Sequence, residues 1–186
     1  MNSTIHISKT KTIRNFHELS ASKVCKNDIA TALSLQCRFS GVMGKFYSVA
    51  EHSVIVSTFC RKSDEVLGLM HDAHEAYIGD ITRPVIESLN CRAQLDELRN
   101  KLDYSIFHHF SMAVDSYGEE RVKMIDNFVL FAERKIFFPN TAMAFPCEDL
   151  LLEKIDAVHD QIKCLPPEKA KELFLRRFED VHGKNG

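Results

Sequence analysis

The sequence predicts an all-α fold, and three features lead to this prediction. The chain of 186 residues contains 7 glycines and 5 prolines, so residues that interrupt helices are sparse. Between them, long segments repeat apolar residues at intervals of three and four, the period of an amphipathic helix. Apolar residues make up 45% of the chain, which is enough to bury the core of one domain.

The N-terminal segment departs from the helical pattern. The stretch "TIHISKTKTIRNF" alternates and is rich in β-branched residues, which predicts a short β-hairpin within the first twenty residues. We therefore expect one domain over residues 1–186, made of an N-terminal extension at 1–26, a core at 27–138 and C-terminal helices at 139–186.

Residues typical of helix starts and ends predict seven helices along the chain. Asp28 can cap the first helix and Ser48 the second, and Ser63 precedes the third. Late breaks follow from the prolines Pro139, Pro146, Pro166 and Pro167. The expected helices span residues 27–37, 48–61, 63–78, 92–114, 118–137, 147–162 and 167–181.

Charge and composition argue against several classes of protein. A net charge of −2 creates no field that attracts nucleic acid, so no specific nucleic-acid partner is expected. No apolar run approaches the roughly 20 residues of a membrane span. The start "MNSTIHISKTK" lacks the apolar segment of a secretory signal, so we expect a cytoplasmic protein. The six cysteines form no CxxC pair, so a zinc finger is not expected.

The stretch "GLMHDAHEAYIGD", residues 68–80, concentrates ionisable residues beside an apolar helical stripe. His71 lies four residues before Glu75, and Asp72 lies three before it, so all three share one patch of the helix. Buried charges without partners are costly. Such a cluster is therefore solvated, internally paired, or arranged around an ion.

Two further helices carry ionisable residues on their apolar faces. His52 lies on the stripe of the helix at 48–61, and Asp126 lies on that of the helix at 118–137. Taken singly, a hydrogen-bonded core histidine and an ion-paired aspartate are the simpler interpretations. Together with His71 and Asp72 they form a set of two imidazoles and two carboxylates. Such a set suits a divalent ion of manganese, cobalt, zinc, iron or nickel better than magnesium or calcium.

The order of these motifs resembles that of a known enzyme family. The stretches "YSVAEHS", "LMHDAHEAYIGDITRP" and "VKMIDNFVLFAER" follow one another as in the HD-domain metal-dependent phosphohydrolases. The segment "IATALSLQCRFSGVMGKFYSVAEHSVIVS" is similar to the small bacterial and phage members that hydrolyse deoxynucleotides. The resemblance covers about residues 28 to 137. It implies an HD-domain helical bundle that self-associates as a dimer or hexamer.

The resemblance also implies roles for individual residues. The metal ligands would be His52, His71, Asp72 and Asp126. Glu75 and Asp80 match acidic residues that orient or activate water and contact the substrate, so they are the candidate catalytic residues. His74 does not complete a zinc-protease HExxH motif and is expected behind the ligands or on the surface.

Substrate contacts follow from the same comparison. Arg38 and Lys123 match phosphate-binding residues, and Phe39 matches an aromatic residue that packs on the sugar and disfavours a 2′-hydroxyl. In the turn "GDITRPVIES" the chain departs from its relatives, because Ile86 occupies the place of a lysine. Arg83 is expected to supply the charge instead.

The expected activity is hydrolysis of a deoxynucleotide with the help of a divalent metal ion. The leading hypothesis is a deoxynucleoside triphosphate (dNTP) triphosphohydrolase that prefers dATP and releases deoxynucleoside and tripolyphosphate. An alternative is a 5′-deoxynucleotidase that acts on deoxynucleoside monophosphates (dNMPs). Two other classes are a nucleotide-binding regulatory HD module without turnover and a helical interaction protein without activity.

Overall fold

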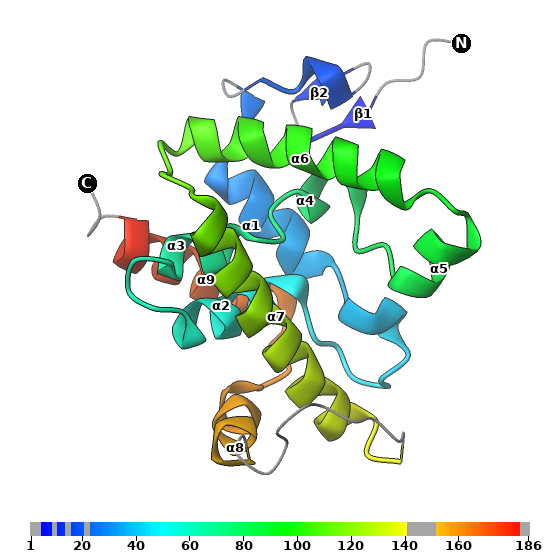
Figure 1. Ribbon diagram of the computed structural model, residues 1–186, viewed down its shortest axis with the longest axis vertical. Helices are drawn as coiled ribbons and strands as arrows, with labels where there is room; N and C mark the ends of the chain where they lie inside the picture. The colour runs from blue at the N-terminus through cyan, green and yellow to red at the C-terminus, as the bar shows by residue number, and fades with distance from the viewer. Residues whose placement is uncertain (1–4, 9–10, 14–15, 21–22, 141–151, 183–186) are drawn as a thin grey trace.

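The computed structural model is all-α with a short N-terminal β-hairpin, which confirms the predicted fold class (Figure 1). It describes residues 5–8, 11–13, 16–20, 23–140 and 152–182. Strand β1 (Ile5–His6) pairs antiparallel with β2 (Thr12–Ile13). The helices are α1 (Lys26–Leu35), α2 (Val49–Phe59), α3 (Glu65–Met70), α4 (Glu75–Ile78), α5 (Arg83–Ser88), α6 (Arg92–His109), α7 (Ser116–Phe137), α8 (Leu152–Gln161) and α9 (Pro167–His182), with 3-10 helices η1 (Phe16–Glu18) and η3 (Arg38–Gly41).

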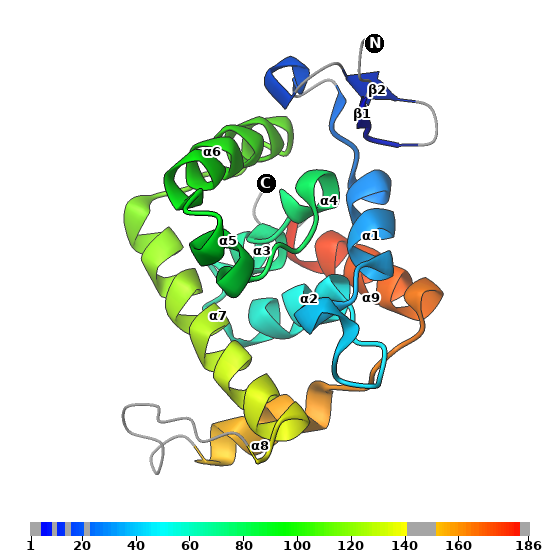
Figure 2. The same cartoon turned by 90° about the vertical axis from the view of Figure 1, so that its right-hand side faces the viewer.

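Helix α2 lies in the middle of the molecule, where α1, α3, α7 and α9 pack around it (Figures 1 and 2). Every residue from Val49 to Ser57 is buried. The Ser48 hydroxyl caps its start by accepting a hydrogen bond from the Glu51 amide, which confirms the predicted cap. A helix buried on all sides has no solvent face, so its polar side chains must find partners in the interior.

Three apolar clusters hold the helices together. The first joins α1, α2, α3 and α9 and contains Phe174 and Phe178. The second packs α7 and α8 on the other side of α2, and the third seats the hairpin and η1 against α6. Each fully buried large side chain contributes about 1.5–3 kcal/mol. None of the described helices combines the length and apolar composition that crossing a membrane requires.

The expected single helix at 63–78 is wrong, because the chain turns between α3 and α4. The amides of Ala73, Glu75 and Ala76 bond carbonyls three residues back, at 3.0, 3.0 and 3.2 Å. Nδ1 of His71 lies 2.9 Å from the Gly68 carbonyl, the group to which a continuous helix would bond the Asp72 amide. A side chain that competes for this carbonyl favours a tight turn.

Other boundaries also differ from the sequence prediction. The segment "RPVIES", expected as a turn, forms α5, whose proline stands in the first turn where its missing amide is not needed. The helix expected at 92–114 ends at His109, and Ser111 beyond it has a left-handed φ of 51°. Asp28 does not cap α1, because Cys25 is the N-cap residue. The start of the helix expected at 147–162 lies outside the described residues.

Glu51, next to His52 on α2, fastens the connection between α8 and α9. Its carboxylate accepts the backbone amides of Lys163, Cys164 and Leu165 at 2.6, 3.0 and 2.8 Å. The Glu51 residue is 1% exposed. Three successive amides that converge on one buried carboxylate form a strong anchor for the chain.

We predict that Glu51→Ala lowers the free energy of unfolding by roughly 3 kcal/mol, because it leaves three amides without their charged acceptor. Chemical denaturation at pH 7 measures the change. Glu97→Ala is the matched control: Glu97 is exposed on α6 and pairs with the exposed Lys101. It should cost less than about 0.5 kcal/mol. Equal losses in both variants would contradict the proposed anchor.

Candidate metal centre

A cavity of about 1050 Å³ is lined by η3, α5, α6, α7 and the turn between α3 and α5. Nine of the ten site residues expected from the sequence line it: Arg38, Phe39, His71, Asp72, Glu75, Asp80, Arg83, Lys123 and Asp126. The tenth, His52, is fully buried on α2. Residues that are up to 88 positions apart in the chain therefore surround one space.

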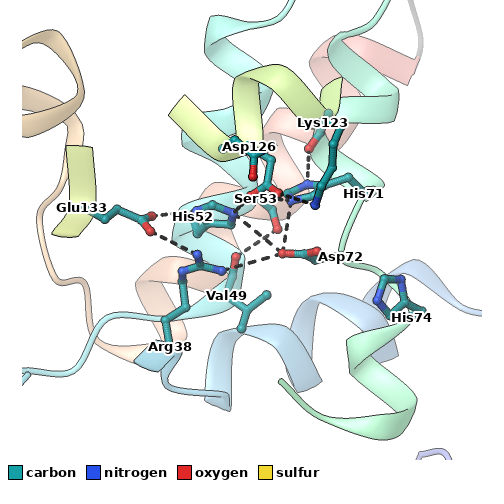
Figure 3. A network of polar contacts seen from close by, with 12 residues as sticks. Arg38, Val49, His52, Ser53, His71, Asp72, His74, Lys123, Asp126 and Glu133 are labelled. Atoms are coloured by element: carbon teal, nitrogen blue, oxygen red, sulfur yellow. Dashed lines mark hydrogen bonds and ion pairs between the residues drawn. The ribbon is translucent and has the colours of Figure 1, made fainter. Parts of the chain in front are cut away.

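The four expected metal ligands approach one another closely (Figure 3). Nε2 of His52 lies 3.3 Å from an Asp126 oxygen and 3.7 Å from an Asp72 oxygen. Nε2 of His71 lies 3.1 Å from the same Asp72 oxygen and 3.7 Å from the same Asp126 oxygen. Ligands about 2.1 Å from one ion are separated by about 3.0 to 3.4 Å in octahedral or tetrahedral geometry. The observed separations lie at or slightly above that range.

Hydrogen bonds orient both imidazoles so that a ring nitrogen faces the carboxylates. Nδ1 of His71 lies 2.9 Å from the Gly68 carbonyl, which can only accept, so this nitrogen donates. Nδ1 of His52 lies 2.7 Å from the Glu133 carboxylate and donates to it. In a neutral ring the opposite nitrogen then carries a lone pair.

Both Nε2 atoms are buried and lack a hydrogen-bond partner within the described residues. Two such lone pairs beside two carboxylates repel one another unless a cation lies among them. The cation can be protons on the rings or a metal ion. A ring whose other nitrogen donates to a carbonyl or carboxylate is the usual arrangement of a metal-binding histidine. The donor set and its geometry therefore fit a divalent ion.

Glu133 on α7 is the residue at this site that the sequence prediction missed. Its fully buried carboxylate accepts from His52 Nδ1 and the Tyr47 hydroxyl, both at 2.7 Å, and from Arg38 Nη2 at 3.1 Å. Its position seven residues after Asp126, on the same stripe of one helix, was the available signal. The apolar stripe predicts that Glu133 points into the interior, but it does not predict which residues form hydrogen bonds with its carboxylate.

The charges of the centre stabilise one another. Burial alone would raise the pKa of the Asp126 carboxyl, but the His52 and His71 imidazoles beside it hold that pKa well below its usual value. Burial opposes protonation of both imidazoles. Asp72 and Asp126 nevertheless raise the pKa of His71 well above normal, and Glu133 and Asp126 raise that of His52. Without a bound metal ion, the site therefore favours the protonated form of both imidazoles.

Glu75 and Asp80 lie in the cavity beside the four ligands. One Glu75 oxygen is buried without a hydrogen-bond partner among the described residues. Burial, with the charges of Asp72 and Asp80, raises the pKa of Glu75 well above its usual value. Burial raises that of Asp80 as well, although Arg38 opposes the rise. Carboxyl groups with raised pKa values can carry a proton closer to neutral pH than an ordinary carboxyl group.

The expected substrate-binding residues surround the centre. Arg38 is 8% exposed and lies 3.7 Å from Asp72 through Nη1, and its Nε is buried without a partner in the described part of the chain. Lys123 pairs with Asp126 at 3.1 Å. Arg83 is exposed and reaches Asn127 at 3.4 Å. Phe39 follows Arg38 with a left-handed φ of 53°, and its ring lies edge-on to that of Phe138 with centroids 5.5 Å apart.

His74 is neither a ligand of this group nor a surface residue. It is 7% exposed, and its Nδ1 lies 3.0 Å from an Asp103 oxygen. Figure 3 shows it apart from the contacts of His52 and His71. Oxygens of Asp72 and Glu75 nevertheless lie within 4.8 Å of a ring nitrogen of His74, so these three residues form a second candidate group. The sequence alone gave no sign of Asp103.

Comparison with known proteins shows the family to which the chain belongs. No protein-family model matches the chain. A relative from Escherichia coli strain K12, named uncharacterized protein YfdR, is 31% identical over 168 residues, and the match covers 89% of each chain. The chain belongs to the YfdR family. The relative's name states no activity, so membership of the YfdR family assigns neither a substrate nor a reaction to the centre.

We predict that the protein binds one divalent metal ion through His71 and not through His74. Calorimetric titration of the metal-free protein with Mn²⁺ or Zn²⁺ should give one site per chain. His71→Ala should abolish tight binding because it removes one of two oriented imidazoles. His74→Ala, a matched loss of a histidine three residues away, should bind within about threefold of the unaltered protein.

The reverse outcome, with binding lost in His74→Ala and kept in His71→Ala, would assign the ion to the group of Asp72, His74 and Glu75 instead. Binding that neither substitution changes would place the ion elsewhere. Circular dichroism of each variant separates loss of a ligand from loss of the fold.

We predict that stability of the metal-free protein falls as pH rises. The raised pKa values of His52 and His71 make protonation stabilising below about pH 6.5, the unfolded value, and this contribution disappears as pH rises through the folded values. In EDTA, Tm should drop as pH rises above about 6.5. Saturating Mn²⁺ should stabilise more at the higher pH, because protons compete for the same nitrogens.

His71→Ala serves as the control for this pH dependence. It removes one of the two titrating imidazoles, so its Tm in EDTA should fall less over the same range. A Tm that rises with pH in the unaltered metal-free protein would contradict the assignment of charge to this cluster.

Proposed function

We propose that this chain is a metal-dependent phosphohydrolase of deoxynucleotides, with dATP-preferring dNTP triphosphohydrolase as the leading activity. One observation carries the proposal. The Nε2 atoms of His52 and His71 are buried, without a hydrogen-bond partner among the described residues, and oriented toward Asp72 and Asp126, beside a cavity that holds a basic residue, Arg38. The resemblance to HD-domain phosphohydrolases points to the same chemistry.

The group that His52, His71, Asp72 and Asp126 would hold is a divalent ion of manganese, cobalt, zinc, iron or nickel. When bound, such an ion lowers the pKa of a water molecule from about 16 toward roughly 7 and polarises a phosphoryl oxygen. The protein contributes the orientation of the ligands. Glu133 fixes His52, and the Gly68 carbonyl fixes His71.

Arg38 is the residue best placed to bind the phosphate. Ion pairs with Glu133 and Asp72 keep its guanidinium charged and raise its pKa in spite of burial. Its buried Nε, which no described residue pairs, leaves a donor for an anionic ligand. A guanidinium that donates to two phosphate oxygens neutralises charge that develops in the transition state. Lys123 provides a second, more exposed cation beside Asp126.

Glu75 and Asp80 are the groups that hold and move protons. Their raised pKa values allow a carboxyl in this pair to accept a proton from water or to give one to the leaving 5′ oxygen at neutral pH. General acid–base catalysis contributes on the order of 10²–10⁴-fold. The reaction needs no covalent intermediate with the protein.

The sugar and base would lie at the aromatic end of the cavity. Phe39 and Phe138 line it with Val42 and Leu130. The left-handed backbone of Phe39 presents its ring beside Arg38, whose guanidinium lies 5.4 Å from the ring centroid. A ring held against the phosphate-binding arginine can pack on a deoxyribose and leave no room for a 2′-hydroxyl.

A second candidate is a 5′-deoxynucleotidase that acts on dNMPs. It is favoured by Ile86, which lines the cavity, is 2% exposed and offers no charge to distal phosphates. The two candidates share the centre and differ in the substrate's phosphate count.

We predict turnover of dATP to deoxyadenosine and tripolyphosphate in the presence of Mn²⁺ or Co²⁺. The assay compares dATP, dGTP, dAMP and ATP, and ion chromatography distinguishes orthophosphate from tripolyphosphate. His71→Ala and Asp126→Ala should each lower kcat by at least about 10²-fold, because removing one ligand disorders the ion. His159→Ala, exposed on α8, is the matched control and should keep full activity.

Each alternative gives a different result in this assay. Orthophosphate released from dAMP but no product from dATP would favour the 5′-deoxynucleotidase. Nucleotide and metal binding without any product would favour a regulatory module. Full turnover in both ligand variants would refute the assigned centre.

A further inference from the structure

One face of α6 forms a wall of the cavity that the proposed chemistry does not use. Its residues follow one another at helical spacing: Arg92, Asp96, Arg99, Asn100, Asp103 and Phe107. The two acidic groups on this face already have partners. Asp103 binds His74 at 3.0 Å, and Asp96, 51% exposed, lies 3.6 Å from Arg99. The basic groups therefore determine which ligand this wall attracts.

Arg99 has unused hydrogen-bonding capacity. Its side chain is 22% exposed, and its Nε is buried without a hydrogen-bond partner within the described residues. Its Nη1 approaches the Asp96 carboxylate, but the 3.6 Å separation is too long for a strong hydrogen bond. A guanidinium has five donors, and a buried donor left unpaired is costly. Arg99 therefore has a hydrogen-bond donor that an anionic ligand could accept from.

The other basic residues around the centre are already engaged. Arg38 pairs with Glu133 and Asp72, and Lys123 pairs with Asp126. Arg83 donates to Asn127. By comparison, Arg99 has a single carboxylate at 3.6 Å among the described residues, and unlike the exposed Arg83 it has a buried Nε left unpaired.

Arg99 and the aromatic pair belong to different walls of the cavity. Phe39 and Phe138 come from η3 and the C-terminal end of α7, whereas Arg99 comes from α6. The positive charges of Arg38 and Arg99 both oppose the rise in the pKa of Asp80, so both guanidinium groups interact electrostatically with Asp80. A ligand with its base on the aromatic rings and one phosphate at the centre would extend its remaining phosphates toward α6.

We propose that Arg99 forms a subsite for the β- and γ-phosphates of a nucleoside triphosphate. This inference rests on the proposed function and selects between its two candidates, because a monophosphate has no β- or γ-phosphate to occupy the subsite. Arg99 supplies on α6 the positive charge that Ile86 does not supply on α5.

Calorimetric binding of dATP and dAMP to the metal-free protein in EDTA tests the subsite without turnover. Arg99→Gln should weaken dATP binding by about tenfold or more, the value of a charge-assisted hydrogen bond, and change dAMP binding by less than about twofold. Arg99→Lys should fall between, because it keeps the charge and loses the planar donors. Lys101→Gln is the matched control: Lys101 is exposed on α6 and pairs with Glu97. It should leave both affinities unchanged.

Equal weakening of dATP and dAMP, or no change in either, would overturn the subsite. The subsite is also refuted if the unaltered protein binds dATP no more tightly than dAMP. Failure of the proposed function gives a different pattern. A protein that shows the Arg99-dependent preference for dATP but releases no product with metal present retains the subsite and refutes the hydrolase.

Discussion

The buried carboxylate of Glu133 is the constraint on which the rest of the centre depends. A charge without solvent costs several kcal/mol unless donors surround it. Here His52, Tyr47 and Arg38 surround it, and they come from α2 and from the segment that precedes it. One carboxylate thus fixes the orientation of a candidate metal ligand and of the candidate phosphate-binding arginine. Neither can move without leaving Glu133 under-paired.

The surrounding fold makes this arrangement rigid. Helix α2 is buried along nine successive residues, its start is capped by Ser48, and Glu51 on the same helix anchors the connection to α9. The interior nevertheless contains two imidazole nitrogens that face two carboxylates and have no hydrogen-bond partner among the described residues. A folded state that places these atoms together suffers electrostatic repulsion unless a cation is bound, so metal affinity and stability are linked through the same four side chains.

Local sequence patterns predicted much of the fold, and the family resemblance implied most of the candidate site. Helices α2 and α7 were expected nearly at their observed bounds, because periodicity and capping residues act within a few positions. The prediction of one helix at 63–78 failed where His71 binds a backbone carbonyl, and α5 was missed because the stretch "GDITRPVIES" was expected to be a turn. The residues that the ordered histidine and aspartate motifs single out meet at one cavity. Glu133 lies inside a quoted motif but was assigned no role, and Arg99 lies outside all of the quoted motifs.

The sequence by itself determined the helical class, the N-terminal hairpin and which face of α7 points inward, since periodicity and capping are properties of neighbouring residues. Only the tertiary structure decided which side chains meet. His52 and Glu133 are 81 positions apart, and their pairing depends on how α2 crosses α7. The orientation of each imidazole and the available donor of Arg99 likewise follow from packing, because a hydrogen bond requires a position in space that no local pattern encodes.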